Sequence, residues 1–287
     1  SDASAIANKL LTCFNAPFQA GEHEFFTSAS IGISLYPQDG TDVATLIRNA
    51  DAAMYRSKAK GRNRVEAYTL DLTAQASERI ALEHELRRAI ERNELSLCFQ
   101  PKLSLKTQSL VGAEALIRWS HPTFGEVPPE HFIHLAEENG TILQIGDWVL
   151  EQACRQMQAW KMHYDPFGPL SINLAGAQLR HPHLARRIEQ LLKHYQLTAG
   201  DLQLEITENF IMSQAEEALA VLYQLKKLGV QLAIDDFGTG YSSLSYLKRL
   251  PLDILKIDKS FIRGLPDDPH DAAIARAIIA LGRSMQL

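Results

Sequence analysis

The sequence predicts an α/β fold built mainly from parallel strands that are joined by helices. From about residue 80 onward, six apolar segments of strand length alternate with segments of helical periodicity. This alternation fits either an open doubly wound sheet or a closed eight-stranded (β/α) barrel. No glycine-rich dinucleotide fingerprint follows an early strand, which favours the barrel. A shorter α/β segment precedes the alternation.

The first 68 residues contain this shorter segment. The expected elements, in order, are a helix near 5–11, strands on either side of Gly21, a strand at 25–35, a helix after Asp42 and a strand at 65–68. Asp42 is a residue type that caps helices, and Gly61 is a type that ends them. The segment is too short for a complete α/β domain, so we interpret it as the remnant of one.

A polar stretch at 69–79 is expected to link this remnant to the main domain, residues 80–287. A helix with apolar positions near 82–90 opens that domain. The expected strands lie at 95–100, 110–119, 170–174, 202–206, 230–235 and 254–257. One intervening helix has clear end signals, because Ser213 and Glu216 form a capping-box pattern and Gly229 follows the apolar stripe.

Composition excludes several classes of protein. The net charge of −5 and the pI near 6.1 argue against a nucleic acid polymer as partner. The cysteines Cys13, Cys98 and Cys154 are odd in number and widely spaced, which indicates small core residues in a reducing, cytoplasmic protein. No signal peptide or apolar span is recognisable. Most of the ten histidines, His121 among them, fall in expected loops or helix starts and are interpreted as surface residues.

Asp235 and Asp236 form the most informative pair, directly after an apolar strand and before a loop with two glycines. Neighbouring residues of a strand point to opposite faces, so the pair can serve one site only if the strand ends there. Two close carboxylates repel each other unless a cation lies between them, and hard divalent cations take oxygen ligands. The alternative for this stretch alone is an ordinary turn or helix cap.

Four other strands carry a polar residue on the same inner face, near their carboxyl ends. These residues are Glu114, Asn173, Glu205 and Lys256. Burying them together is costly without compensation, and one or two divalent cations would supply it. Lys256 is suited to orient an attacking water or to balance charge. Arg118 is placed for a bidentate grip on a phosphate, with a surface ion pair as the alternative.

These motifs resemble the EAL family of cyclic di-GMP phosphodiesterases. The signature is Glu114-Ala115-Leu116-x-Arg118, and 205–208, 235–243 and 256–258 are similar to the later motifs in the right order. The resemblance covers about residues 80–287. It implies a TIM-type barrel and hydrolysis, dependent on Mg²⁺ or Mn²⁺, of one phosphodiester bond to give the linear dinucleotide.

The resemblance also implies roles for single residues. Expected metal ligands are Glu114, Asn173, Glu205, Asp235 and Asp236. Expected ligand contacts are Gln100, Leu116 and Arg118. Lys256 is expected to position the water, and Glu208 to brace the loop at 236–243. Ala175 stands where the family has a serine, which affects local hydrogen bonding more than metal ligation.

Residues 1–68 resemble the carboxyl-terminal part of a GGDEF, or diguanylate cyclase, domain, on the strength of 30–33, 49–55 and 58–63. The family implies a further strand with another catalytic glutamate after the last helix, so we expect this sequence to be part of a longer protein. Sensor or membrane segments outside it and a homodimer through the EAL domain are left open. An alternative function is an inactive cyclic di-GMP receptor or scaffold, although such members typically lose Glu114 or the Asp235-Asp236 pair.

Overall fold

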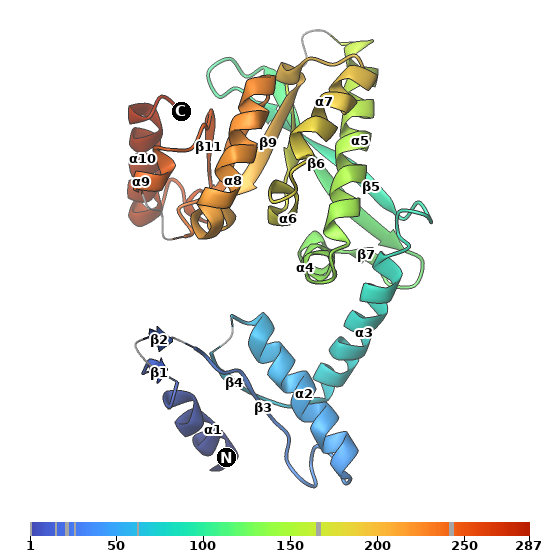
Figure 1. Ribbon diagram of the computed structural model, residues 1–287, viewed down its shortest axis with the longest axis vertical. Helices are drawn as coiled ribbons and strands as arrows, with labels where there is room; N and C mark the ends of the chain where they lie inside the picture. The colour runs from blue at the N-terminus through green and yellow to red at the C-terminus, as the bar shows by residue number, and fades with distance from the viewer. Residues whose placement is uncertain are drawn as a thin grey trace. The chain divides into compact units, whose positions relative to one another are not determined.

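The computed structural model describes residues 2–14, 16–20, 23–25, 27–61, 63–164, 168–240 and 244–287. Their contacts divide the chain into two compact units, Ser1–His84 and Glu85–Leu287. Figure 1 shows the helices and strands of both units, and each unit is described by itself. The expected boundary between residues 79 and 80 stays a prediction.

The first unit contains two small sheets, one of which is covered by helices. Its elements are α1 Asp2–Thr12, β1 Phe18–Ala20, β2 His23–Phe25, β3 Ile31–Ile33, α2 Val43–Ala59, β4 Val65–Ala67 and α3 Leu70–Leu86. Strands β1 and β2 pair antiparallel, and β3 and β4 pair parallel. A Cβ on Gly32 would lie 2.0 Å from the carbonyl oxygen of Ala50, so only glycine lets α2 approach β3 this closely.

Two expectations for this unit need correction. The strand expected at 25–35 is confirmed only in part, because among the described residues of that range Phe25 ends β2 and Ile31–Ile33 forms the short strand β3. Helix α3 begins at Leu70, so most of the polar stretch expected to link the domains is helical. The cap on α2 is confirmed, since the Asp42 side chain accepts a hydrogen bond from the Thr45 backbone N–H at 2.9 Å.

The second unit alternates strands and helices. Its strands are β5 Leu95–Leu103, β6 Leu110–His121, β7 Gly125–Val127, β8 Leu170–Asn173, β9 Leu202–Thr207, β10 Gln231–Phe237 and β11 Ile254–Ile257. Its helices are α4 Pro129–Asn139, α5 Ile142–Lys161, α6 Gly176–Leu179, α7 Leu184–His194, α8 Glu208–Leu228, α9 Leu244–Leu247 and α10 Pro269–Ser284. The six expected strands are all present, and the short β7 is an addition.

The strand order is β11-β10-β9-β8-β6-β5, with β7 paired to β6. The neighbours β6-β8, β8-β9, β9-β10 and β10-β11 are parallel, as expected, but β5 and β7 both pair antiparallel with β6. For β5 this was not expected. The connection of six residues between β5 and β6 is too short for the crossover helix that parallel neighbours need. Among the described residues no pairing joins β5 to β11, so these strands form an open portion of a barrel.

The two faces of the strands differ as the period-two pattern predicts. The apolar residues of β8 and β9 that alternate with Ser171, Gln203 and Glu205 are fully buried: Leu170, Ile172, Leu202, Leu204 and Ile206. Helix α5 packs on β8, and α8 packs on β9 and β10 (Figure 1). The polar residues therefore lie on the opposite, inner face.

The start of α8 differs from the prediction. The helix begins at Glu208, directly after β9, rather than at the capping-box pattern of Ser213 and Glu216. Because Thr207 is extended and Glu208 is already helical, the strand and the helix share a boundary. The expected end is confirmed, since Gly229 adopts a φ of +92° as the C-cap.

Two burial expectations, for the cysteines and for the histidines, are also wrong in part. Cys154 is buried, but Cys13 and Cys98 are exposed. His121 is only 7% exposed, because it lies at the end of β6, where its Nδ1 accepts hydrogen bonds from the Thr123 and Phe124 backbone N–H groups.

In the part of the chain that the structure describes, no helix combines the length and apolar character that crossing a bilayer requires.

Candidate active site

Three carboxylates from three different strands converge on the inner face. Glu114 lies on β6, Glu205 on β9 and Asp235 on β10, and one oxygen of each lies within 4.8 Å of the others. We call these three residues the acid cluster. Asn173 on β8 joins it, since its Nδ2 donates to Glu114 Oε1 at 2.8 Å. The parallel register places Asn173 beside Glu205, which explains why residues far apart in the sequence meet here.

Lys256 on β11 lies among these carboxylates. Its Nζ is 2.7 Å from Asp235 Oδ2 and 3.2 Å from Glu114 Oε2, and it also donates to Glu205 Oε2. Burial opposes the charged form, but the charge of Glu205 and the hydrogen bonds to Asp235 and Glu205 outweigh it and raise the pKa of Lys256. The side chain is therefore a fixed ammonium that balances part of the cluster's charge.

Asp236, an expected metal ligand, lies outside the acid cluster, because only Glu114, Glu205 and Asp235 bring oxygens within 4.8 Å of one another among the described residues. The strand does not end at Asp235 as expected; β10 continues to Phe237, and Asp236 takes a left-handed φ of +54° where the register with β11 is irregular. Asp236 is exposed overall. Partial burial of its carboxyl and the negative charges of Asp235 and Asp258 nevertheless raise its pKa. A nearby cation would relieve this repulsion.

Glu208 contacts the loop that follows β10. Its side chain is fully buried, and its Oε2 accepts hydrogen bonds from the backbone N–H groups of Gly238 at 2.8 Å and Gly240 at 3.4 Å. These are the contacts that a brace of this loop requires. Their effect on metal binding stays a prediction, and the loop residues 241–243 lie outside the described residues.

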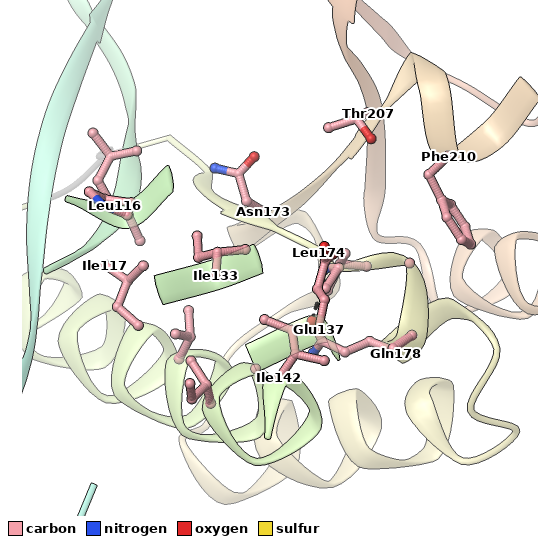
Figure 2. A pocket seen from close by; sticks show the side chains of 18 of the residues that line it. Leu116, Ile117, Ile133, Glu137, Ile142, Asn173, Leu174, Gln178, Thr207 and Phe210 are labelled. Carbon is pink, nitrogen blue, oxygen red and sulfur yellow. Dashed lines mark hydrogen bonds between the residues drawn. The ribbon is translucent and has the colours of Figure 1, made fainter. Parts of the chain in front are cut away.

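A cavity of about 590 Å³ opens beside the acid cluster, between the ends of β6 and β8 and the helices α4, α5 and α6. Arg118 lines this cavity. Figure 2 shows Leu116, Asn173, Ile133 and Ile142 in its wall, which is largely apolar. Arg118 Nη1 donates to the carbonyl of Ile117 at 2.8 Å. Gln100, opposite Glu114 in the β5–β6 register, is exposed and is not among the described residues of the cavity wall.

Sequence reasoning missed several residues that contact the site. Asp258 interacts with the Asp236 side chain. Lys102 on β5 and Gln203 on β9 both donate to Glu205 Oε1, and Lys102 also contacts Ser171. Ser171 and Gln203 alternate with apolar residues and so share the inner face, but this alternation indicates no hydrogen-bond partner for them. Near Ala175, Gln178 Oε1 accepts the Ala175 backbone N–H at 3.1 Å, which supplies a local hydrogen bond at this position.

The residues present fit a divalent cation. The acid cluster offers three carboxylates within reach of one centre, with the Asn173 amide beside them. All of these groups carry hard oxygen ligands, which Mg²⁺ and Mn²⁺ prefer. The three carboxylates of the cluster each form an ion pair with the ammonium group of Lys256, which shows that their geometry suits a positive charge.

Comparisons with known proteins agree with this geometry. A family model described as EAL domain matches residues 83–287, and one described as diguanylate cyclase, GGDEF domain matches residues 1–64. The chain is 46% identical over 287 residues to MucR of Pseudomonas aeruginosa, a bifunctional diguanylate cyclase/cyclic di-GMP phosphodiesterase. It is 36% identical over 287 residues to the cyclic di-GMP phosphodiesterase PdeR of Escherichia coli.

In both alignments 100% of this chain is covered, but only 42% of MucR and 43% of PdeR, so the chain spans less than half the length of these relatives. Among solved structures, the PaMucR phosphodiesterase in complex with c-di-GMP matches with a TM-score of 0.69 and 46% identity. That match covers 72% of this chain and 84% of the other. The chain therefore belongs to the EAL-domain family and carries a partial GGDEF domain before its EAL domain.

Proposed function

We propose that this chain carries the metal-dependent centre of a cyclic di-GMP phosphodiesterase, which hydrolyses one phosphodiester bond and releases the linear dinucleotide. The observation that supports this most is the acid cluster, in which Glu114, Glu205 and Asp235 converge from three strands around Lys256. Relatives named as cyclic di-GMP phosphodiesterases and a related structure in complex with c-di-GMP support the substrate.

In this proposal the acid cluster, Asn173 and Asp236 hold Mg²⁺ or Mn²⁺. The bound metal would polarise the phosphate and lower the pKa of a water molecule to give the nucleophile. Lys256, fixed by its ion pairs, orients that water and balances charge. Arg118, at the edge of the cavity, binds a phosphate oxygen of the substrate.

The cavity beside the acid cluster supports a substrate with a flat, partly apolar group next to its phosphate. Its volume of about 590 Å³ is in the range of small-molecule sites, and its wall is apolar with a few polar groups at the edge. We infer that one nucleobase of the dinucleotide enters this cavity while the phosphate lies between Arg118 and the acid cluster. Leu116 would contact the nucleotide at the entrance.

The test uses the full-length protein that contains this chain, with purified cyclic di-GMP and Mg²⁺ or Mn²⁺. The wild type is expected to form the linear dinucleotide, and Glu114→Ala is expected to lose turnover because the cluster loses a ligand. Glu130→Ala, which removes an exposed carboxylate on α4, is the matched control and should retain activity. Unchanged turnover in Glu114→Ala would refute the mechanism. Binding of cyclic di-GMP without hydrolysis in the wild type would select the receptor function instead.

Further parts of the proposal need separate measurements. We propose a cytoplasmic location, which the three free cysteines support. Measuring the mass of the full-length protein in solution tests for a homodimer through the EAL domain. The complete sequence of that protein tests whether it contains sensor or membrane segments.

A further inference from the structure

A layer of polar side chains lies on the inner face of the strands, one step from the acid cluster toward the amino ends of the parallel strands. We call Lys102, Ser171 and Gln203 the polar layer. Ser171 and Gln203 precede Asn173 and Glu205 by two residues, so they share the inner face with them. Ser171 is 0% and Gln203 is 3% exposed. Branched apolar residues usually fill the interior of such a barrel, so three polar residues at this depth are unusual and indicate a specific role.

The hydrogen bonds described for the polar layer converge on one oxygen atom. Gln203 Nε2 donates to Glu205 Oε1 at 2.9 Å, and Lys102 Nζ donates to the same oxygen at 3.2 Å. Lys102 is itself held by Ser171, whose Oγ accepts a hydrogen bond from it. The other oxygen of the carboxylate, Oε2, faces Lys256. The two oxygens of Glu205 therefore have different surroundings, one in the polar layer and one in the acid cluster.

Glu205 depends on protein donors more than its partners in the acid cluster do. Its side chain is 0% exposed, whereas those of Glu114 and Asp235 are 17% and 18% exposed. Water can therefore solvate Glu114 and Asp235, but it does not reach Glu205. A buried carboxylate needs hydrogen bonds from the protein, and two donors on one oxygen also restrict rotation of the carboxylate plane.

We propose that Gln203 and Lys102 are positioning residues that hold Glu205 with Oε2 directed at the metal. They touch neither the metal nor the substrate, and they act through the orientation of one metal ligand. This inference rests on the proposed function, since it takes the acid cluster to be the metal site. It assigns a role to residues outside the family motifs that identify the site.

The experiment measures the dissociation constant of Mn²⁺ for the full-length protein by electron paramagnetic resonance of the free ion, without substrate. Gln203→Leu removes one donor without changing charge. Lys102→Met removes the other donor, and Lys102→Arg retains both a donor and the charge. The matched controls are Gln190→Leu and Lys106→Met, which make the same substitutions at exposed positions.

We expect Gln203→Leu and Lys102→Met each to weaken Mn²⁺ binding by about 10- to 100-fold, as losing a partner of a metal ligand typically does. Lys102→Arg and both controls should bind Mn²⁺ within about 3-fold of the wild type, because the donor to Glu205 is retained. In the assay, saturating Mn²⁺ should restore much of kcat in Gln203→Leu, and KM for cyclic di-GMP should change little.

Unchanged Mn²⁺ affinity in both Gln203→Leu and Lys102→Met would overturn the inference. Tighter binding in Lys102→Met would also overturn it, since it would show that the lysine mainly repels the metal. If Gln203→Leu does not fold, Lys102→Met decides alone, because that side chain is 28% exposed and its loss leaves less of a void. A wild type that does not bind Mn²⁺ would instead refute the proposed metal site.

Discussion

Replacing Glu208 tests whether the loop after β10 must be braced for the site to bind metal. The buried carboxylate accepts the Gly238 N–H at 2.8 Å, and a hydrogen bond to a charged group contributes about 1.5–3 kcal/mol. The second bond, to Gly240 at 3.4 Å, is at the limit of useful geometry and adds little. Glu208→Ala should therefore destabilise the ordered loop by about 2 kcal/mol relative to open states, or roughly 30-fold in population.

Comparing Glu208→Ala with Glu208→Gln separates the contribution of the negative charge of Glu208 from that of its oxygen as a hydrogen-bond acceptor. Glu208→Gln retains a carbonyl oxygen of similar reach but loses the charge, so we expect about half the effect, near 1 kcal/mol or roughly 5-fold. Hydrogen exchange of the Gly238 amide measures the opening of the loop, and Mn²⁺ titration measures its consequence for the acid cluster. The melting temperature separates a local effect from global unfolding.

We expect faster exchange at Gly238 and weaker Mn²⁺ binding in the order Glu208→Ala, Glu208→Gln, wild type. Asp236 precedes the braced glycine by two residues, so its carboxylate depends on the conformation of this loop. A folded Glu208→Ala variant with wild-type exchange at Gly238 and wild-type Mn²⁺ affinity would refute the reasoning.

Three further predictions concern substrate binding, loop backbone and thiol chemistry. Arg118→Lys retains the charge but loses the bidentate geometry, so KM for cyclic di-GMP should rise about 10-fold with a smaller change in kcat; an unchanged KM would exclude the phosphate contact. Gly238→Ala should lower the Tm by several degrees, because φ is +104° and the new Cβ would lie 2.8 Å from the Phe261 ring. In the control Gly200→Ala, the new Cβ would meet no neighbouring group within 4 Å, so the Tm should not change. Burial raises the pKa of the Cys154 thiol to about 12, so iodoacetamide at neutral pH should label only the other two cysteines until the protein is denatured; rapid labelling of Cys154 in the native state would contradict this.

The sequence by itself predicted the class of fold and the residues of the acid cluster. Period-two alternation places Leu204 and Glu205 on opposite faces wherever the strand begins, because a strand has only two faces. Apolar segments of strand length are an equally direct signal, and all six strands expected from them are present. The chemistry of Asp235 and Asp236 was also readable, since two adjacent carboxylates after a buried strand need a cation or a turn.

Tertiary structure decided what the local pattern could not express. Three features depend on strand partners and on an irregular register between β10 and β11 that no local signal encodes. They are the antiparallel pairing of β5, the left-handed φ of Asp236 and the start of α8 at Glu208. Of the two donors to Glu205 Oε1, Gln203 lies two residues away on the same strand, whereas Lys102 lies on β5, 103 residues away in the sequence. Only the arrangement of the strands in the sheet brings Lys102 to the buried oxygen that Gln203 also contacts, because hydrogen bonding acts over a few ångströms of space and not over sequence.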